Sequence, residues 1–368
     1  MSGPYDLVVI GLTLSSSWGN GHATTYRALL RGLHGLGQKV LFLERDVPWY
    51  ATNRDLPAPD FCALAYFADT AALVAGAGRA IAGAGAVMIG SYVPDGPAVI
   101  EAVHALRPAR LCFYDIDTPV TLAKLERGDE EYLQRQQIPF FDIYFSFSGG
   151  PILRRLESQW GARRALPLYC AVDAARYRHT GEQAKWDLGY LGTYSPDRQG
   201  TLERLLLEPA RRLAQMRFVV AGPQYPEGIA WPDNVERIEH LAQAEHASFY
   251  SRQRFTLNIT RADMIAAGWS PSVRLFEAGA CNTPVISDPS PGLVDFFPEG
   301  EAIVIAQDSG QVVAALSGIH DAARSGIAAN AHRRVIDRHT GAARAGELLK
   351  ALDTIPPRAT AQTLRQTV

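Results

Sequence analysis

Short apolar runs alternate along this chain with longer segments in which apolar residues recur at helical spacing. Each short run reads as a buried strand, because strands that are covered on both faces are apolar throughout. The segment from His22 to Leu36 illustrates the helical spacing, with an apolar face made of Tyr26, Leu29, Leu30, Leu33 and Leu36. Such alternation is typical of a parallel sheet with helices on both of its faces.

The alternation occurs twice, which predicts two sheets. The first series places strands over residues 7–11, 39–43, 86–89, 110–114 and 143–147. The second places them over residues 188–191, 217–221, 235–238, 255–259, 283–286 and 302–305. We therefore expect an α/β fold of two doubly wound, Rossmann-like domains that face each other across a cleft, with functional groups at the carboxyl ends of the strands.

The domain boundaries follow from where the two series meet. We expect an N-terminal domain over residues 1–170 and a C-terminal domain over residues 171–335, joined by a stretch that can act as a hinge. A helix over residues 336–355 can cross back to the first domain. The tail over residues 356–368 lacks an apolar face, and we expect it to be poorly ordered.

Composition narrows the class of protein without choosing a function. The chain has 368 residues, 47% of them hydrophobic, which is enough for two domains with cores of their own. Its 36 basic and 38 acidic residues nearly cancel, so nucleic acid is not expected as an obligatory partner. The four cysteines form no C-x-x-C pair, and no targeting or membrane-spanning segment is evident, so we expect a cytoplasmic protein of unknown oligomeric state.

The stretch SVRLFEAGACNTPVISD, from Ser272 to Asp288, carries the clearest local signals. Ser272 is suited to cap a helix that ends around residues 280–282, where Asn282 can adopt the left-handed conformation. Pro284 prevents the helix from continuing, and a short buried strand follows it. The stretch therefore predicts a helix, a tight turn and a strand.

Two charged residues on that helix suggest a ligand. The unpaired amides at a helix N-terminus, together with Arg274, suit a diphosphate, and Glu277 one turn further on can accept the hydroxyls of a ribose. The residues alone leave a second interpretation open, in which Arg274 and Glu277 are solvated charges on an ordinary surface helix.

The same stretch resembles the donor signature of GT-B glycosyltransferases, R-x-F-E-x-x-A-x-x-x-P-V-I, and departs from many members at Cys281-Asn282, where they carry a glycine. NVERIEHL (Asn234 to Leu241) and LNITR (Leu257 to Arg261) resemble neighbouring strands of that fold. GTYSPDR (Gly192 to Arg198) and LVDFFPEG (Leu293 to Gly300) are similar to segments of the glycosyltransferases related to spore maturation protein CgeB. The resemblance covers about half of the chain well and implies a nucleotide-sugar donor site in the C-terminal domain.

The resemblance and the residue types together nominate the donor-binding residues. The leaving diphosphate must be stabilised by cations and backbone amides. The nucleotide base must lie against residues at the end of a strand, and the ribose hydroxyls need hydrogen-bond acceptors. The candidates are Gly192, Tyr194, Arg198, His240, Leu241, Arg261, Ser272, Arg274 and Glu277. Arg198 and Arg261 have alternative interpretations as a turn residue and as the ion-pair partner of Asp263.

The loop after the first predicted strand, LTLSSSWGNGHATT, is rich in small and hydroxyl side chains. It lacks the G-x-G-x-x-G dinucleotide fingerprint, although Glu44 ends the second strand where a dehydrogenase would place its ribose-binding acid. His22 is a candidate base for an acceptor hydroxyl, a role that the resemblance to inverting GT-B enzymes supports; the alternative is a capping or surface histidine. Acceptor-binding candidates nearby are Trp18, Gly21, Trp49 and Tyr50, of which the aromatic residues can instead belong to the core.

Asp115 and Asp117 follow the fourth predicted strand, in CFYDIDTP. One carboxylate can orient the imidazolium of His22, one can itself be the base, or the pair can resemble the D-x-D metal motif of the other major glycosyltransferase fold. We expect Asp115 to point into the cleft as the second catalytic candidate and Asp117 to cap the following helix.

These features predict a glycosyltransferase of the hexosyltransferase kind. It would move a sugar from a nucleoside-diphosphate sugar, its co-substrate, to an acceptor hydroxyl or other nucleophile that the sequence does not identify. No metal site and no cofactor are expected. Two alternatives stay open: a nucleotide-sugar epimerase, and a sugar- or nucleotide-binding protein without turnover.

Overall fold

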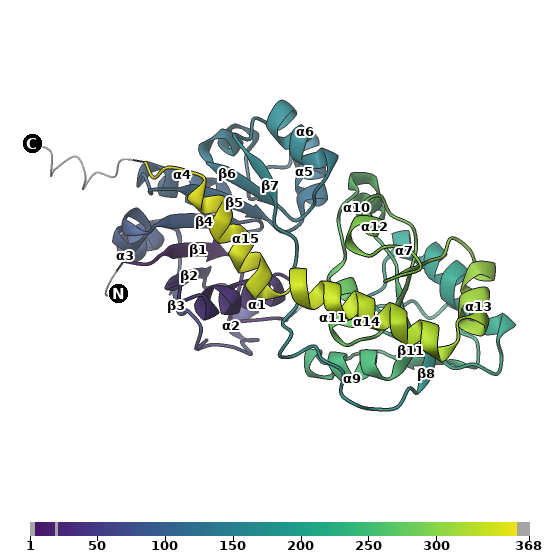
Figure 1. The fold of residues 1–368 in the computed structure, drawn as a ribbon. Helices are drawn as coiled ribbons and strands as arrows, with labels where there is room; N and C mark the ends of the chain where they lie inside the picture. Colours follow the sequence, from purple (N-terminus) through teal and green to yellow (C-terminus); the bar gives the residue numbers. More distant parts are fainter. Residues whose placement is uncertain (1–3, 19–20, 359–368) are drawn as a thin grey trace, which may run out of the picture. The chain divides into compact units, whose positions relative to one another are not determined.

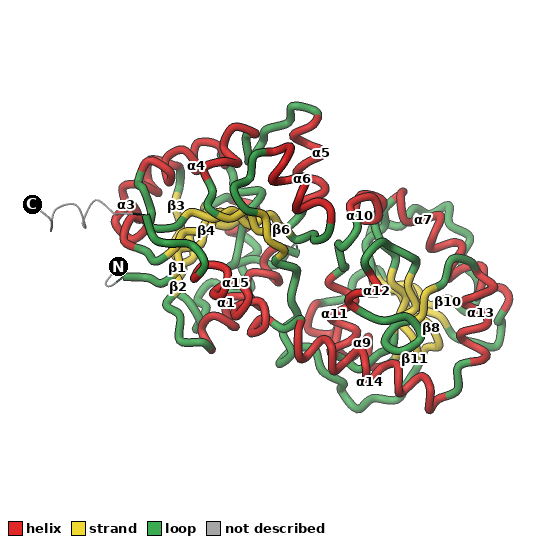
Figure 2. The backbone as a smooth tube through the Cα atoms, turned by 45° about the horizontal axis from the view of Figure 1, so that its top comes forward, coloured by secondary structure: helices red, strands yellow, loops and turns green. Residues whose placement is uncertain are grey.

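The chain forms two compact α/β units in the computed structural model, which describes residues 4–18 and 21–358 (Figure 1). The first unit contains the chain up to Ala171 and again from Gly341 onward. The second unit contains Val172 to Thr340. In each unit helices cover both faces of a parallel sheet, as Figure 2 shows.

The sheet of the first unit has seven strands in the order β3-β2-β1-β4-β5-β6-β7. Every pairing in it is parallel. The central strands are buried along their whole length, which explains their uninterrupted apolar sequences. The strands are β1 (Leu7–Gly11), β2 (Val40–Arg45), β3 (Ala63–Phe67), β4 (Ala86–Gly90), β5 (Leu111–Asp115), β6 (Ile143–Ser146) and β7 (Ala165–Pro167).

Two glycines allow the first and last helices of this unit to pack closely. A Cβ on Gly32 would collide with the backbone of Gly341, and a Cβ on Gly341 would collide with the carbonyl of Ala28. The helices are α1 (His22–Gly35), α2 (Pro48–Ala51), α3 (Thr70–Gly83), α4 (Gly96–Ala105), α5 (Thr118–Glu126), a 3-10 helix (Arg135–Phe140), α6 (Pro151–Trp160) and α15 (Gly341–Asp353).

The sheet of the second unit has six strands in the order β10-β9-β8-β11-β12-β13, again all parallel. The strands are β8 (Trp186–Leu191), β9 (Phe218–Ala221), β10 (Val235–Ile238), β11 (Gln253–Asn258), β12 (Val285–Ser287) and β13 (Val304–Ile305). The helices are α7 (Pro196–Leu202), a π-helix (Glu203–Leu207), α8 (Glu208–Arg212), a 3-10 helix (Gln243–Glu245), α9 (His246–Ser251), α10 (Ala262–Ala267), α11 (Val273–Ala280), α12 (Leu293–Phe296), α13 (Ser309–Gly318) and α14 (Asp321–Arg338).

Both sheets run in the Rossmann order. The strand that comes first in each sequence lies in the middle, and the chain reverses direction across the sheet between β1 and β4 and between β8 and β11. Ligands of open α/β sheets bind beyond the carboxyl ends of the strands at such switch points. Each unit therefore has one edge where a ligand site is expected.

The predicted strands are all present, but the C-terminal prediction needs correction. The helix expected over residues 336–355 is two helices, because α14 ends at Arg338 and α15 begins at Gly341. The tail expected to be poorly ordered over residues 356–368 begins in a fixed position, since Arg358 donates to the Asp142 carboxylate (2.7 Å) and to the carbonyl of Phe140. Residues 359–368 lie outside the described part of the chain.

Candidate functional site

The helix at the switch point of the second unit forms as its sequence predicts. Ser272 is the N-cap of α11, and its hydroxyl accepts a hydrogen bond from the amide of Arg274 (3.3 Å). Asn282, just after the helix, has the left-handed backbone (φ 56°) expected of it. The β12 strand follows at Val285, so the predicted sequence of helix, turn and strand is confirmed.

Arg274 joins the two strands that flank this switch point. Its Nε donates to the carbonyl of Leu191 at the end of β8 (2.7 Å), and a terminal nitrogen donates to the side-chain oxygen of Asn258 at the end of β11 (2.9 Å). Only 8% of Arg274 is exposed. The alternative of a solvated surface arginine is therefore wrong. Arg274 is a buried cation fixed between two strand ends.

Gly192, in the loop after β8, lies directly against this arginine. A Cβ at this position would come within 2.6 Å of the Tyr190 hydroxyl and 3.1 Å of a terminal nitrogen of Arg274. The carbonyl of Gly192 accepts a hydrogen bond from the Tyr225 hydroxyl (3.0 Å). A side chain at position 192 would thus displace the arginine or the tyrosine, which explains a glycine here.

Glu277 is also buried, with 6% of its surface exposed. One of its carboxylate oxygens accepts a hydrogen bond from the hydroxyl of Tyr250 (3.0 Å), and Tyr177 also bonds to the carboxylate. Burial and the neighbouring Glu277 carboxylate raise the pKa of Tyr250 well above its ordinary value. The alternative of a solvated surface glutamate is wrong. The two tyrosines fix the carboxylate on the helix one turn from its N-terminus.

The remaining donor candidates lie at or beyond the strand ends of the same unit. Tyr194 packs against Tyr225, with ring centroids 5.6 Å apart, and Arg198 donates from a terminal nitrogen to the carbonyl of Thr193 (2.8 Å). The Nε of Arg198 is buried and has no hydrogen-bond partner among the described residues. Arg261 is the exposed N-cap residue of α10. His240 and Leu241 follow β10, where His240 is exposed.

Two polar groups that the sequence interpretation missed stabilise this edge of the sheet. The carboxylate of Asp288, after β12, accepts hydrogen bonds from the amide (3.0 Å) and the hydroxyl (2.8 Å) of Thr260, after β11. Trp269 has a left-handed backbone (φ 44°), and its indole nitrogen donates to Asp295 (2.6 Å). The available signals were an acid at the end of the predicted strand, Asp288, and an acid within LVDFFPEG, Asp295. An acid at such a position does not by itself distinguish a ligand contact from a loop contact.

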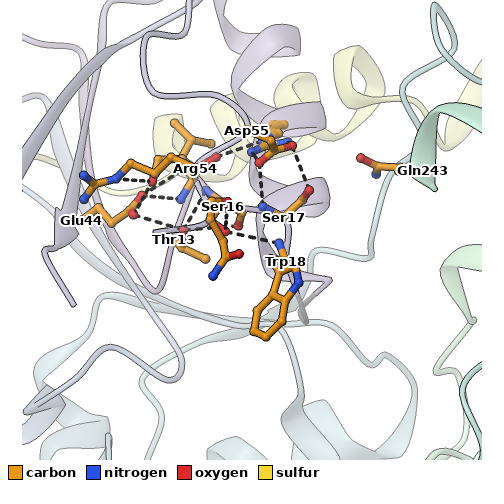
Figure 3. A network of polar contacts seen from close by, with 12 residues as sticks. Thr13, Ser16, Ser17, Trp18, Glu44, Arg54, Asp55 and Gln243 are labelled. Atoms are coloured by element: carbon orange, nitrogen blue, oxygen red, sulfur yellow. Dashed lines mark hydrogen bonds and ion pairs between the residues drawn. The ribbon is translucent and has the colours of Figure 1, made fainter. Parts of the chain in front are cut away.

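In the first unit, the loop after β1 is held by a buried acid (Figure 3). Glu44, at the end of β2, has no exposed surface. Its carboxylate accepts four hydrogen bonds: from the hydroxyls of Thr13 (3.1 Å) and Ser15 (2.6 Å) and from the amides of Leu14 (2.7 Å) and Ser15 (2.9 Å). The interpretation of Glu44 as a ribose-binding acid is therefore wrong, because the loop already occupies the carboxylate.

A second acid holds the far end of the same loop. Asp55 accepts hydrogen bonds from the amide and the hydroxyl of Ser17, both at 2.9 Å. Arg27 on α1 pairs with Asp55 through two nitrogens (2.7 and 2.8 Å) and donates from Nε to the carbonyl of Leu14 (2.9 Å). These contacts fix the backbone of residues 13–17 between β1 and α1 (Figure 3).

His22 begins α1 and is half-buried. Its ring meets the ring of Tyr92 edge to face, with centroids 5.2 Å apart and planes at 89°. Its Nδ1 is buried and has no hydrogen-bond partner among the described residues. Burial lowers the pKa of His22 from 6.5 to about 4, so the imidazole is neutral near pH 7.

The structure contradicts the expected orientation of the two aspartates. Asp115 is fully buried, and its carboxylate accepts hydrogen bonds from the hydroxyls of Tyr144 (2.5 Å) and Thr121 (2.7 Å). It neither points outward nor orients His22. Burial raises the pKa of Asp115 to about 6. Asp117 occupies the N-cap position of α5 without a capping side-chain bond, and it instead accepts from the Tyr92 hydroxyl (3.3 Å).

The acceptor candidates comprise an exposed aromatic pair and two less distinctive residues. Trp18 and Trp49 are 49% and 61% exposed, and their rings meet at 4.7 Å in an edge-to-face arrangement. The core alternative is therefore wrong for both tryptophans. Tyr50 is half-buried beside Trp49. Gly21 is the N-cap of α1, where a Cβ would meet no atom within 4 Å in the described part of the chain.

Comparison with known proteins identifies the class. Residues 198–350 match the model of a family described as glycosyl transferase-like. This segment includes α11 and every donor candidate except Gly192 and Tyr194. The matched segment, less than half of the chain, is thus glycosyl transferase-like, and the fold of the two units is that of the GT-B glycosyltransferases. No curated protein matches the chain.

Solved structures share the fold over nearly the whole chain. Sucrose-phosphate synthase from Thermosynechococcus elongatus is 13% identical, with a TM-score of 0.69 over 95% of this chain and 99% of the other. Anabaena HepE, in complex with UDP and glucose, is 12% identical, with a TM-score of 0.66 over 95% of this chain and all of the other. An α-glucosyltransferase in complex with UDP and DNA is 11% identical, with a TM-score of 0.66 over 96% of this chain and all of the other. The comparisons support neither the epimerase nor the non-catalytic alternative.

The described residues contain neither a membrane-spanning helix nor a metal-binding cluster. None of their helices has both the length and the apolar composition needed to cross a membrane. Their His, Cys, Asp and Glu side chains form no group of three or more arranged to hold a metal ion. All four cysteines are free thiols, three of them buried.

Proposed function

We propose that the second unit binds the donor, a nucleoside-diphosphate sugar, at its switch point. The observation that carries this proposal is the pair of buried charges on α11, Arg274 and Glu277. Buried charges are rare in proteins unless they are paired or functional, and Arg274 donates to two neutral groups, the carbonyl of Leu191 and the side-chain oxygen of Asn258. A buried cation beside a helix N-terminus favours an anionic ligand, which fits a diphosphate.

The proposal assigns roles to six of the donor candidates. The α11 amides and the charge of Arg274 stabilise the diphosphate as the bond to the sugar breaks, and Arg198 adds a cation near the first loop. The free lone pairs of Glu277 accept the ribose hydroxyls, since one oxygen bonds to Tyr250. Tyr194, His240 and Leu241 frame the nucleotide base. This arrangement neutralises the leaving group through protein charges, so we propose that transfer proceeds without a metal ion.

The first unit binds the acceptor in this proposal, and His22 is its base. The neutral imidazole takes the proton of the acceptor hydroxyl as that oxygen bonds to the anomeric carbon of the sugar. The bond from the same carbon to the diphosphate oxygen breaks, and the diphosphate leaves with the electron pair. The exposed pair of Trp18 and Trp49 offers apolar ring faces to the acceptor. Asp115 has no contact with the substrate in this scheme.

Some finer assignments belong to the proposal as well. Uridine diphosphate is the first donor nucleotide to test, because it occurs in the complexes of HepE and the α-glucosyltransferase. The motifs GTYSPDR and LVDFFPEG favour the CgeB-related group within the glycosyltransferases. The near-neutral net charge of this chain does not favour DNA as its acceptor, although the α-glucosyltransferase was solved in complex with DNA. The free thiols fit a reducing, cytoplasmic location.

A donor-hydrolysis assay tests the proposal without knowledge of the acceptor. The purified protein is incubated with uridine, thymidine, guanosine, adenosine and cytidine diphosphate sugars, with and without magnesium, and released nucleoside diphosphate is measured. We expect release from one nucleotide class, with little dependence on magnesium. Glu277→Ala should abolish the release, whereas Glu208→Ala, an exposed glutamate on α8, should not change it. Equal release by the Glu277→Ala variant would contradict the donor site.

A further inference from the structure

Tyr92 lies at the switch point of the first unit in a backbone conformation that tyrosine rarely adopts. It follows β4 by two residues, and its φ is 63°. Left-handed backbone at a bulky residue is an outlier that persists only where the surrounding contacts hold it, and such outliers concentrate at functional sites. Glycine would adopt this backbone without strain, so a tyrosine at this position is expected to have a role for its side chain.

The Tyr92 side chain connects the start of α1 with the loop after β5. The Tyr92 ring contacts the His22 ring, with ring centroids 5.2 Å apart and nearly perpendicular planes. Its hydroxyl donates to the Asp117 carboxylate (3.3 Å), and its ring packs on Tyr132 at 4.4 Å. Asp117 and Tyr132 therefore hold the Tyr92 side chain in place. The Tyr92 ring in turn packs against the His22 imidazole.

Among the described residues, the charged groups beside Tyr92 and at the end of β5 have partners other than His22. On the β5 side, Asp115 bonds to Tyr144 and Thr121, and Asp117 bonds to Tyr92. On α5, Lys124 pairs with Glu131 and lies 5.7 Å from the Tyr92 ring centroid. Elsewhere in the first unit, Arg27 on α1 pairs with Asp55, and Arg45 pairs with Asp95 in the loop after β4. The neighbour that covers His22 is thus an aromatic ring and not a carboxylate.

We propose that Tyr92 is a positioning residue for the transfer reaction: its ring holds the His22 imidazole in one orientation, neutral and uncommitted, ready to accept the proton of the acceptor. This inference rests on the proposed role of His22 as base. In a triad the base is oriented by a carboxylate, which also stabilises its charged form. Here an apolar ring performs the orientation and favours the neutral form, because it excludes water from the imidazole.

The direct test is an NMR titration of His22 in protein labelled with ¹³C-histidine. The chain has nine histidines, and the His22 signal is assigned as the one missing from His22→Gln. We expect the wild-type signal to titrate with a pKa near the value of about 4 that burial gives it. Tyr92→Phe keeps the ring and should leave this pKa in place, whereas Tyr92→Ala should raise it toward the ordinary value of about 6.5.

The kinetic test uses the same variants. Tyr92→Ala should lower kcat for transfer by about tenfold or more while changing the donor KM by less than about twofold, because a misoriented base affects only the chemical step. Tyr92→Phe, which keeps the ring, should retain most of the wild-type kcat. Arg107→Ala is the matched control, since Arg107 is an exposed residue with left-handed backbone (φ 51°) in the same unit.

The outcomes separate this inference from the proposed function. An unchanged His22 pKa in Tyr92→Ala, or full kcat in that variant, would overturn the role of Tyr92 even if the enzyme transfers sugar as proposed. If no donor is turned over by the wild type, the proposed function fails, and the titration alone then decides whether Tyr92 holds His22.

Discussion

At the residue scale, burial shifts the pKa values of His22 and Asp115 in opposite directions. His22 and Asp115 both lie near the switch point, and burial favours the neutral form of each. For His22 the neutral form is the basic form, so burial keeps it available to accept a proton. The Asp115 carboxylate already accepts hydrogen bonds from two hydroxyl groups, one on each oxygen. These contacts favour His22 over Asp115 as the proposed base.

Asp115→Asn should leave transfer within about threefold of wild type, because Asp115 contacts no substrate in this account. The folded state raises the Asp115 pKa from 3.8 to about 6, so the folded protein holds this proton more tightly than the unfolded chain. The contribution of Asp115 to stability should therefore fall as pH rises from about 4 to 6, by up to about 2–3 kcal/mol, while the lowered pKa of His22 contributes in the opposite direction over the same range. Urea unfolding across this pH range should therefore show that wild type loses stability relative to Asp115→Asn as the pH rises. A loss of transfer in that variant, with its fold intact, would restore Asp115 as a catalytic residue.

His22→Gln should reduce kcat for transfer by roughly 10²–10⁴, the usual contribution of a general base. Nucleotide binding should be unchanged, since His22 belongs to the first unit. Because its pKa is lowered from 6.5 to about 4, the wild-type pH profile should stay flat down through pH 6.5 and fall only near pH 4. A wild-type acid limb centred on pH 6.5, or full activity in His22→Gln, would show that the base lies elsewhere.

The sequence identified these residues more reliably than it identified their surroundings. His22, Asp115 and Glu277 are recognisable because polar residues stand out at the ends of apolar runs. Their partners, Tyr92 and Tyr250, come from segments that are distant along the chain and carry no local signal. The direction in which Asp115 points depends on Tyr144 and Thr121, which donate hydrogen bonds to its carboxylate, and the sequence does not show that these side chains lie there.

At the element scale, the loop after β1 depends on one buried carboxylate. Glu44→Gln should destabilise the first unit by about 1–3 kcal/mol, because the new amide nitrogen would face hydrogen-bond donors of the loop. Denaturant unfolding measures the loss. Asp46→Asn, an exposed acid nearby, serves as the control and should be close to neutral. Equal stability of wild type and Glu44→Gln would indicate that the loop does not need the carboxylate.

The loop after β8 allows a test of the donor site by steric change. Gly192→Ala should weaken nucleotide binding by about tenfold or more, because the added Cβ would come within 3.1 Å of Arg274 and 2.6 Å of Tyr190. Gly200→Ala in α7 is the matched control, since a Cβ there meets no atom within 4 Å among the described residues. Calorimetric titration of both variants with the same nucleotide gives the comparison. Unchanged affinity in Gly192→Ala would remove this loop from the site.

Elements with strong local signals were predictable, and those that depend on tertiary contacts were not. The cap, the apolar face and the left-handed Asn282 specify α11 without reference to the rest of the chain. The sequence interpretation missed β3 because it is an edge strand, exposed along most of its length and therefore without a buried apolar run. It missed β7 because that strand has only three residues.

At the scale of the whole molecule, the two Rossmann-type sheets follow from the repeated alternation of strands and helices. The return of the chain to the first unit at Gly341 does not follow from that pattern. It depends on the close packing of α15 against α1, which needs glycine at both Gly32 and Gly341. Two glycines separated by most of the chain give no periodic signal, so the boundary between α14 and α15 was not predictable.

The central claim is that the second unit binds a nucleoside diphosphate through the charges on α11. Calorimetric titration with the five common nucleoside diphosphates, using wild type and Glu277→Gln, tests it most directly. Glutamine can still accept the Tyr250 hydrogen bond, so the fold should persist while the ribose loses a charged acceptor. The account predicts binding of one diphosphate and an affinity lower by roughly 10–100-fold in Glu277→Gln. Binding of none of the five, or equal affinity in both proteins, would contradict it.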